Sequence, residues 1–245
     1  MLLNNNSKVL YNLMWKIPPD YDEIRHIINH NKMTPAEITL AMVQFIKAIR
    51  YEEDCSEELS SFIGDDNAFE FSYYEKYHSA FLPGLMQTLI ESGLDVNILS
   101  KFGNVLHRIL YLENGYTAAD TFAVLFNNGL DVYTADDDGD SLFDTIDFDI
   151  LFGMRNQYIR RRYDSWLHTW LVFVGYGVKL KNGNCPVDIV YEEDENSEFE
   201  IKDFEIEDLR NHHNYYFGIS YLENRGDKYT IQIFDKRTKY EVARL

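Results

Sequence analysis

The sequence predicts a mostly α-helical fold, an irregular array of helix–turn repeats (a solenoid) that ends in a small C-terminal antiparallel β-sheet. The tetrapeptide Gly-Leu-Asp-Val at residues 93–96 recurs 36 residues later at 129–132. An apolar helical stretch precedes each copy, and three β-like runs close the chain. Recurrence every 20–50 residues is typical of stacked repeat arrays, which mostly serve to hold other macromolecules.

Composition sets limits on the class of protein. With 245 residues, of which 45% are apolar, the chain can build a continuous core, so disorder of the whole chain is excluded. The net charge of −18 is spread along the chain. Such a surface repels nucleic acid and anionic lipid and steers the protein toward basic partners. Solubility alone accounts for the same charge without any partner.

The sequence predicts a soluble cytoplasmic protein without a membrane partner. Its two cysteines, Cys55 and Cys185, are too few and too far apart to indicate a disulfide framework. The N-terminus turns to asparagine after three residues, unlike a secretory signal. The longest apolar stretch, residues 166–178, is shorter than the ~20 residues that cross a bilayer.

Residues 1–66 are expected to form an N-terminal helical cap. A first helix is predicted over residues 20–29, and a second begins at Thr34, with Pro35 and Glu37 in the positions that favour a helix start. A shorter helix is expected over residues 56–62. The second helix should bury one apolar face made of Ile38, Met42, Phe45, Ile46 and Ile49.

Residues 67–190 are expected to hold the repeats. A helix pair over residues 67–81 and 85–92 comes first, with Pro83-Gly84 as the corner between them. Gly93 and Gly129 each suit a left-handed helix C-cap, after which an extended arm leaves the helix. A degraded third copy begins at Gly175, 46 residues after Gly129.

Residues 191–245 are predicted to be an acidic linker followed by a three-stranded antiparallel cap. Residues 192–208 contain ten acids and one base, and residues 199–206 fit either a strand or a linker with one short helix. Strands are expected over residues 215–222, 228–234 and 239–244. Their apolar face should cover the end of the repeats: Phe217, Ile219, Tyr221, Ile231 and Ile233.

The run from Leu89 to Asn97, followed by Gly103-Asn104-Val105-Leu106-His107, resembles the ankyrin repeat in its helix, glycine, Asp-Val-Asn arm and turn. Residues 136–144 and 183–188 align to the same turn, and the resemblance covers about residues 67–190. Only His107 keeps the histidine of the family's Thr-Pro-Leu-His tetrad, and the spacings exceed the usual ~33 residues, so irregular repeats are implied.

The resemblance implies a binding scaffold without catalysis, which uses its hairpin tips. In this chain the tips are residues 98–102, 133–138 and 179–182. The partner-binding residues expected from them are Phe102, Tyr133, Asp136, Asp137, Asp138, Lys179 and Lys181. Further aromatic anchors are expected at Trp166 and at the Tyr215-Tyr216 pair.

Other chemistry has weaker support, and the sequence predicts no metal, cofactor or catalytic residue. The acidic run at residues 136–140 fails the calcium-loop register, because positions one and twelve become Thr134 and Thr145. His26 and His30 are four apart on a helix but lack a third ligand at recognisable spacing. His212 and His213 fit either polar loop residues or acid–base chemistry.

The leading hypothesis is therefore a non-enzymatic protein–protein interaction module with an acidic surface. In its sharper form it is an inhibitor or immunity-type partner of a basic protein, such as a nuclease toxin. The alternative is a hydrolase-like enzyme with a site between the repeat array and the β cap, where His212 or His213 acts with nearby carboxylates. The sequence leaves the oligomeric state open.

Overall fold

The computed structural model describes residues 5–50, 68–100, 103–104, 116–134, 167–179, 187, 205–221 and 229–244. In this part of the chain the protein is mostly helical, with one small three-stranded antiparallel sheet, as the sequence predicts. The chain forms two compact units. The first comprises Met1–Glu113 and Val124–Leu142, and the second comprises Asn114–Ala123 and Phe143–Leu245. The boundaries expected after residues 66 and 190 lie outside the described residues.

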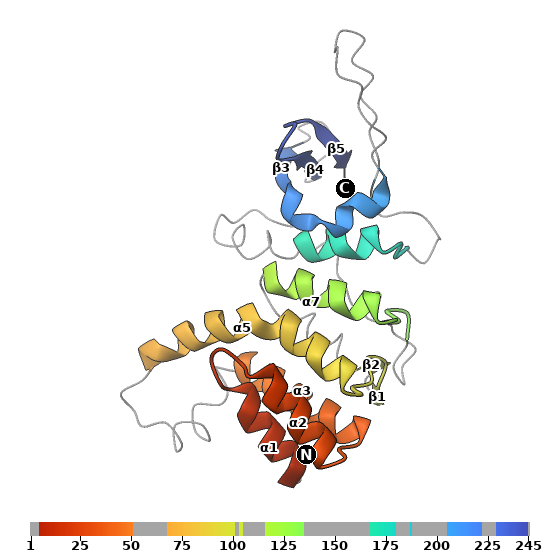
Figure 1. Ribbon diagram of the computed structural model, residues 1–245. Helices are drawn as coiled ribbons and strands as arrows, with labels where there is room; N and C mark the ends of the chain where they lie inside the picture. Colours follow the sequence, from red (N-terminus) through yellow and green to blue (C-terminus); the bar gives the residue numbers. More distant parts are fainter. Residues whose placement is uncertain are drawn as a thin grey trace. The chain divides into compact units, whose positions relative to one another are not determined.

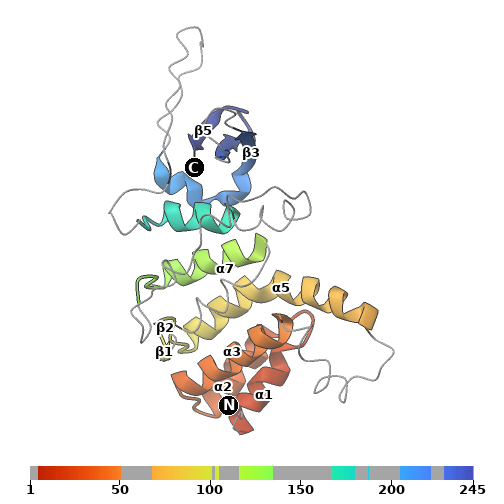
Figure 2. The ribbon, with the colours of Figure 1, turned by 180° about the vertical axis from the view of Figure 1, so that it is seen from behind.

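In the first unit, helices α1 (Asn5–Met14), α2 (Tyr21–His30) and α3 (Pro35–Arg50) gather along one side of α5 (Ala68–Glu91) in both views (Figures 1 and 2). Helix α1 precedes the first helix that the sequence predicted. The expected helix over residues 56–62 lies outside the described residues. The core consists of fully buried apolar side chains, including Leu10, Met14, Ile24, Phe45, Leu85 and Met86.

The helix starts follow from local chemistry. Asp20 caps α2 by accepting a 3.0 Å hydrogen bond from the Glu23 amide. At the start of α3, the Glu37 amide donates to Thr34 Oγ1, and the Thr34 amide donates back to the Glu37 carboxylate. This capping box satisfies amides that have no partner inside the helix. The predicted start of α3 is therefore confirmed, and its Ile38, Met42, Phe45 and Ile46 are buried as expected.

The predicted corner at Pro83-Gly84 is wrong, because α5 runs through both residues as one helix (Figure 1). Gly84 lies against the hydroxyl end of Tyr21, and a Cβ at this position would lie 2.7 Å from Tyr21 Oη. The glycine therefore permits close packing of α2 on α5 rather than a turn. Pro83 removes one backbone donor, while burial of Leu82, Leu85 and Met86 keeps the segment helical.

The second unit contains the first part of α7 (Tyr116–Asn127), a helix that includes residues 167–175, and the C-terminal sheet. Phe122 of α7 packs edge-to-face on Phe173, with ring centroids 4.9 Å apart. Two 3-10 turns, η1 (Ile206–Arg210) and η2 (His212–Asn214), lead into the sheet. The sequence left open whether residues 199–206 form a strand or a linker with one short helix. The structure describes only the last two of these residues, and η1 begins at Ile206.

The sheet is the predicted meander, with strand order β3 (Tyr215–Tyr221), β4 (Tyr229–Asp235) and β5 (Glu241–Arg244). Ile231 and Ile233 are buried, as expected. Tyr215 is also buried, which corrects its prediction as an exposed anchor, whereas its neighbour Tyr216 points to the other face and is 36% exposed. Burial, together with Asp208 and Asp235, raises the pKa of Tyr215 to about 12.

Candidate functional site

Three helices end in the same backbone motif. Gly93, Gly129 and Gly177 have φ values of +107°, +85° and +79°. In each case the next residue donates to the carbonyl five residues before it, as in Leu94 to Leu89 and Val178 to Phe173. The glycine itself donates to the carbonyl three residues before it. This is the Schellman motif, which glycine adopts at little steric cost.

The third copy of the cap is therefore Gly177 and not Gly175, which corrects the predicted register. Gly175 lies inside the helix, and a Cβ there would lie 2.6 Å from the Arg210 amide nitrogen. Arg210 also donates a 2.8 Å hydrogen bond from Nε to the Gly175 carbonyl and lies over the Tyr176 ring. Gly175 thus permits the close approach of η1 to this helix.

The arms after the first two caps share a local turn. The Asp95 carboxylate accepts from the Asn97 amide at 2.9 Å, and the Asp131 carboxylate accepts from the Tyr133 amide at the same distance. After the first arm, the hairpin expected over residues 98–102 is present as β1 (Leu99–Ser100) paired with β2 (Gly103–Asn104). The two arms are therefore built alike from similar sequences.

The Asn97 side chain joins the first arm to the second cap. Asn97 Nδ2 donates to the Gly129 carbonyl at 2.8 Å, and Asn97 Oδ1 accepts from the Asp131 amide at 2.9 Å. One amide side chain thus satisfies a donor and an acceptor of the following arm. Asn97 is four residues after the cap glycine Gly93. The equivalent positions after Gly129 and Gly177 are Tyr133 and Lys181, whose side chains carry no amide that could make the same two hydrogen bonds.

Of the predicted partner-binding residues, the structure describes two. Tyr133 is 51% exposed, and Lys179 is exposed in the other unit. Phe102, Asp136, Asp137, Asp138 and Lys181 lie outside the described residues, as do Trp166 and His107.

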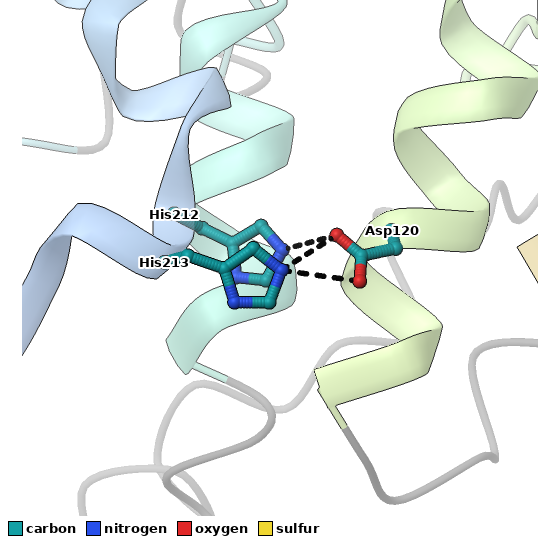
Figure 3. A group of neighbouring side chains, drawn as sticks. All are labelled: Asp120, His212 and His213. Carbon is teal, nitrogen blue, oxygen red and sulfur yellow. Dashed lines mark hydrogen bonds and ion pairs between the residues drawn. The ribbon is translucent and has the colours of Figure 1, made fainter. Parts of the chain in front are cut away.

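A cluster of titratable side chains lies in the second unit. Asp120 comes from α7, and His212 and His213 come from η2 (Figure 3). His212 Nε2 lies 2.8 Å from Asp120 Oδ1, and His213 Nε2 lies 3.0 and 3.1 Å from the two carboxylate oxygens. The His212 side chain is 1% exposed, that of Asp120 is 38% exposed and that of His213 is 60% exposed. The carboxylate thus connects a buried imidazole to an exposed one.

The buried end of this cluster is His168, which is 3% exposed and packs edge-on against Phe217. Its Nδ1 lies 3.1 Å from both the carbonyl oxygen and Nδ1 of His212. A carbonyl only accepts, so His168 Nδ1 carries a proton. His212 Nδ1 then accepts, and its Nε2 carries the proton donated to Asp120. The three side chains form one directional chain of hydrogen bonds.

Burial lowers the pKa of His168 to about 4, with further contributions from the neighbouring His212 and Lys236. His168 is therefore neutral at pH 7. Burial raises the pKa of Asp120, but hydrogen bonds from His212 and His213 and the attraction of these residues outweigh it, so the net pKa is lowered. The Asp120 carboxylate is ionised at pH 7 and accepts from both rings.

The sequence analysis singled out His212 and His213 but missed Asp120 and His168. Both histidines lie in the short turn before β3, where polar loop residues were one of the two expectations, but His212 is buried and hydrogen-bonded to Asp120. His26 and His30 stack at 5.6 Å on α2, as their spacing requires. Among the described residues, the only group of three or more possible metal ligands is Asp120, His212 and His213. The acidic run at residues 136–140 lies outside the described residues.

No helix in the described ranges has the length and apolar character to cross a membrane. No family model, curated protein or solved structure matches this chain.

Proposed function

We propose that this protein is a non-catalytic protein-binding scaffold built from irregular ankyrin-like repeats. The observation that carries the proposal is the common construction of the arms after Gly93 and Gly129, with Tyr133 half-exposed on the second arm. Repeat arrays bind partners through such repeated, surface-directed segments. Tyrosine is enriched among the residues that dominate binding energy.

Tyr133 is suited to act as an anchor because its backbone is already fixed. Its amide donates to Asp131 Oδ1, and the Asp131 amide is held by Asn97. A side chain on a preorganised backbone loses less conformational entropy on binding. The arm therefore presents an aromatic residue at limited entropic cost.

The net charge of −18 supports a basic partner. A negative surface raises the association rate with a positive one, and the effect weakens as salt rises. An inhibitor or immunity-type protein that covers the cationic site of a nuclease toxin fits this chemistry.

Capture from a lysate of the native source with the tagged full chain, washed at low and then raised salt, tests the proposal. We expect a stoichiometric basic partner that elutes as salt rises. With the purified partner, Tyr133→Ala should weaken binding by about tenfold or more. Tyr240→Ala is the matched control, because Tyr240 is similarly exposed, at 46%, and belongs to the other unit. Failure to retain any partner, or equal binding by wild type and Tyr133→Ala, contradicts the proposal.

One observation favours a second candidate, a hydrolase-like enzyme. The Asp120 carboxylate holds an exposed imidazole, His213, through its Nε2. A carboxylate that holds one ring nitrogen orients the imidazole for general-base chemistry at the other nitrogen, Nδ1. The enzyme is supported if the wild type shows a hydrolytic activity that both Asp120→Asn and His213→Gln lose, while both variants still capture the partner. Hydrolysis that is equal in wild type and both variants excludes it.

A further inference from the structure

We infer that Asp120, His212 and His213 form a binding site for one divalent ion of the Zn²⁺ class. Each side chain offers one ligand atom, and these atoms all lie within 4.8 Å of one another. Both imidazole rings direct Nε2 at the carboxylate of Asp120 (Figure 3). Two imidazole nitrogens and one carboxylate oxygen are a recurring ligand set for first-row divalent ions.

The spacing of the ligand atoms suits such an ion. Ligands about 2.0–2.1 Å from a tetrahedral Zn²⁺ lie about 3.3 Å from each other. The nitrogen–oxygen distances here are 2.8 Å for His212 and 3.0 Å for His213. Each ring nitrogen and the carboxylate oxygen need to separate by only about half an ångström or less to admit the ion, and the two ring nitrogens lie within 4.8 Å of each other. The present hydrogen bonds thus hold the ligands near their coordinating positions.

The backbone explains how two successive histidines reach the same point. In an extended strand neighbouring side chains point to opposite faces. Here both histidines lie in the 3-10 turn η2, and their rings are 3.9 Å apart at an interplanar angle of 35°. Lys236 fixes this turn, since its amide donates to Asn214 and its Nζ donates to the His213 carbonyl.

His168 lies next to the buried ligand. Its Nδ1 is 3.1 Å from His212 Nδ1 and 3.1 Å from the His212 carbonyl oxygen. An ion on His212 Nε2 requires the proton of that ring to move to Nδ1, the nitrogen that faces His168. Ion binding therefore changes the contact between the two rings, and the tautomer of His212 reports it.

The ligand set also defines the class of ion. Nitrogen ligands suit Zn²⁺ and its neighbours, whereas Ca²⁺ and Mg²⁺ prefer oxygen. Asp120 and His213 are partly exposed, so a fourth position faces solvent. The site goes beyond the proposed scaffold function and does not depend on it.

The test uses the chelator-treated full chain, titrated with Zn²⁺ by calorimetry and with Co²⁺ by visible absorption. We expect one equivalent to bind, with the spectrum of four-coordinate Co²⁺, and Mg²⁺ not to compete. Asp120→Asn and His213→Gln should each weaken Zn²⁺ binding by more than about 100-fold, because loss of an outer partner alone costs about 10–100-fold. The ¹⁵N shifts of His212 should show its proton move from Nε2 to Nδ1.

His26→Gln is the matched control, because it disrupts the stacked pair His26 and His30 on α2. Its Zn²⁺ affinity should equal that of wild type. His213→Gln replaces an exposed ring, and circular dichroism verifies that this variant folds. The inference is overturned if wild type retains no Zn²⁺ or Co²⁺ after gel filtration. It is also overturned if the folded His213→Gln variant binds like wild type, or if His26→Gln abolishes binding.

Discussion

The side-chain amide of Asn97 donates a 2.8 Å hydrogen bond to the carbonyl of Gly129, the glycine that follows the end of α7. The same side chain accepts from the Asp131 amide. The residue that follows the first Gly-Leu-Asp-Val segment is thus hydrogen-bonded to the backbone of the second segment. This bond fixes the register between the first two arms.

Asn97→Ala should lower the free energy of unfolding by about 1–2 kcal/mol, because two hydrogen bonds to backbone groups are lost. Urea denaturation of the full chain measures the change. Asn29→Ala, on the exposed face of α2, is the control and should change stability by less than about 0.5 kcal/mol. Equal effects of the two substitutions would contradict the bridging role of Asn97.

The cap glycines should tolerate alanine poorly. Gly129 and Gly177 have positive φ, and a Cβ at either position would meet nothing within 4 Å, so the cost is conformational alone. We expect Gly129→Ala and Gly177→Ala each to cost about 1–2 kcal/mol. Gly177→Asn should cost less, because asparagine tolerates the left-handed region better. Thermal unfolding compares the three variants. A Gly177→Ala variant as stable as wild type would contradict the assignment of Gly177 as the third cap.

The stability of the protein should fall as the pH decreases from about 6.5 to 4. Unfolded His168 takes up a proton near its ordinary pKa of about 6.5, whereas the folded ring remains neutral down to about 4. The unfolded state then binds more protons, so the free energy of unfolding falls by up to about 2–3 kcal/mol. Denaturation at several pH values measures the fall, and NMR should show that His168 does not titrate above pH 5. Titration of the His168 ring near 6.5 would contradict its burial as a neutral group.

Removal of the Asp120 carboxylate should destabilise the second unit. Asp120→Ala leaves Nε2–H of the buried His212 without its acceptor, at a cost of about 1–3 kcal/mol. Asp22→Ala is the control, since Asp22 is 96% exposed and pairs with Arg25 on its own helix. That surface pair should contribute less than about 0.5 kcal/mol. If Asp120→Ala and Asp22→Ala are equally stable, the hydrogen-bond chain does not hold this unit together.

Local chemistry made part of the fold predictable. The Thr34-Glu37 capping box and the cap glycines act within a few residues, and the C-terminal strands alternate with a period of two. The errors arose where distant contacts decide the conformation. Gly84 makes room for Tyr21, and Gly175 makes room for Arg210. Gly84 is therefore not the predicted corner, and Gly175 is not the predicted helix cap. Tertiary contacts overrode the local glycine signal in both cases.

The candidate site was only half predictable for the same reason. His212 and His213 attract attention as adjacent residues of one titratable type. Asp120 lies 92 residues from His212 in the sequence, on a helix whose pattern is otherwise that of a core element. His168 sits in an apolar run that resembles any buried helix. A single sequence carries no signal for contacts at such separations.

Amide hydrogen exchange at Asp131, resolved by NMR, tests most directly the claim that the Asn97 side chain joins the arm after Gly93 to the arm after Gly129. The account predicts slow exchange of the Asp131 amide in wild type and a marked acceleration in Asn97→Ala. The Leu130 amide, which donates within its own helix cap, should keep its rate in both proteins. Fast exchange at Asp131 in wild type, or an unchanged rate in Asn97→Ala, would contradict the account.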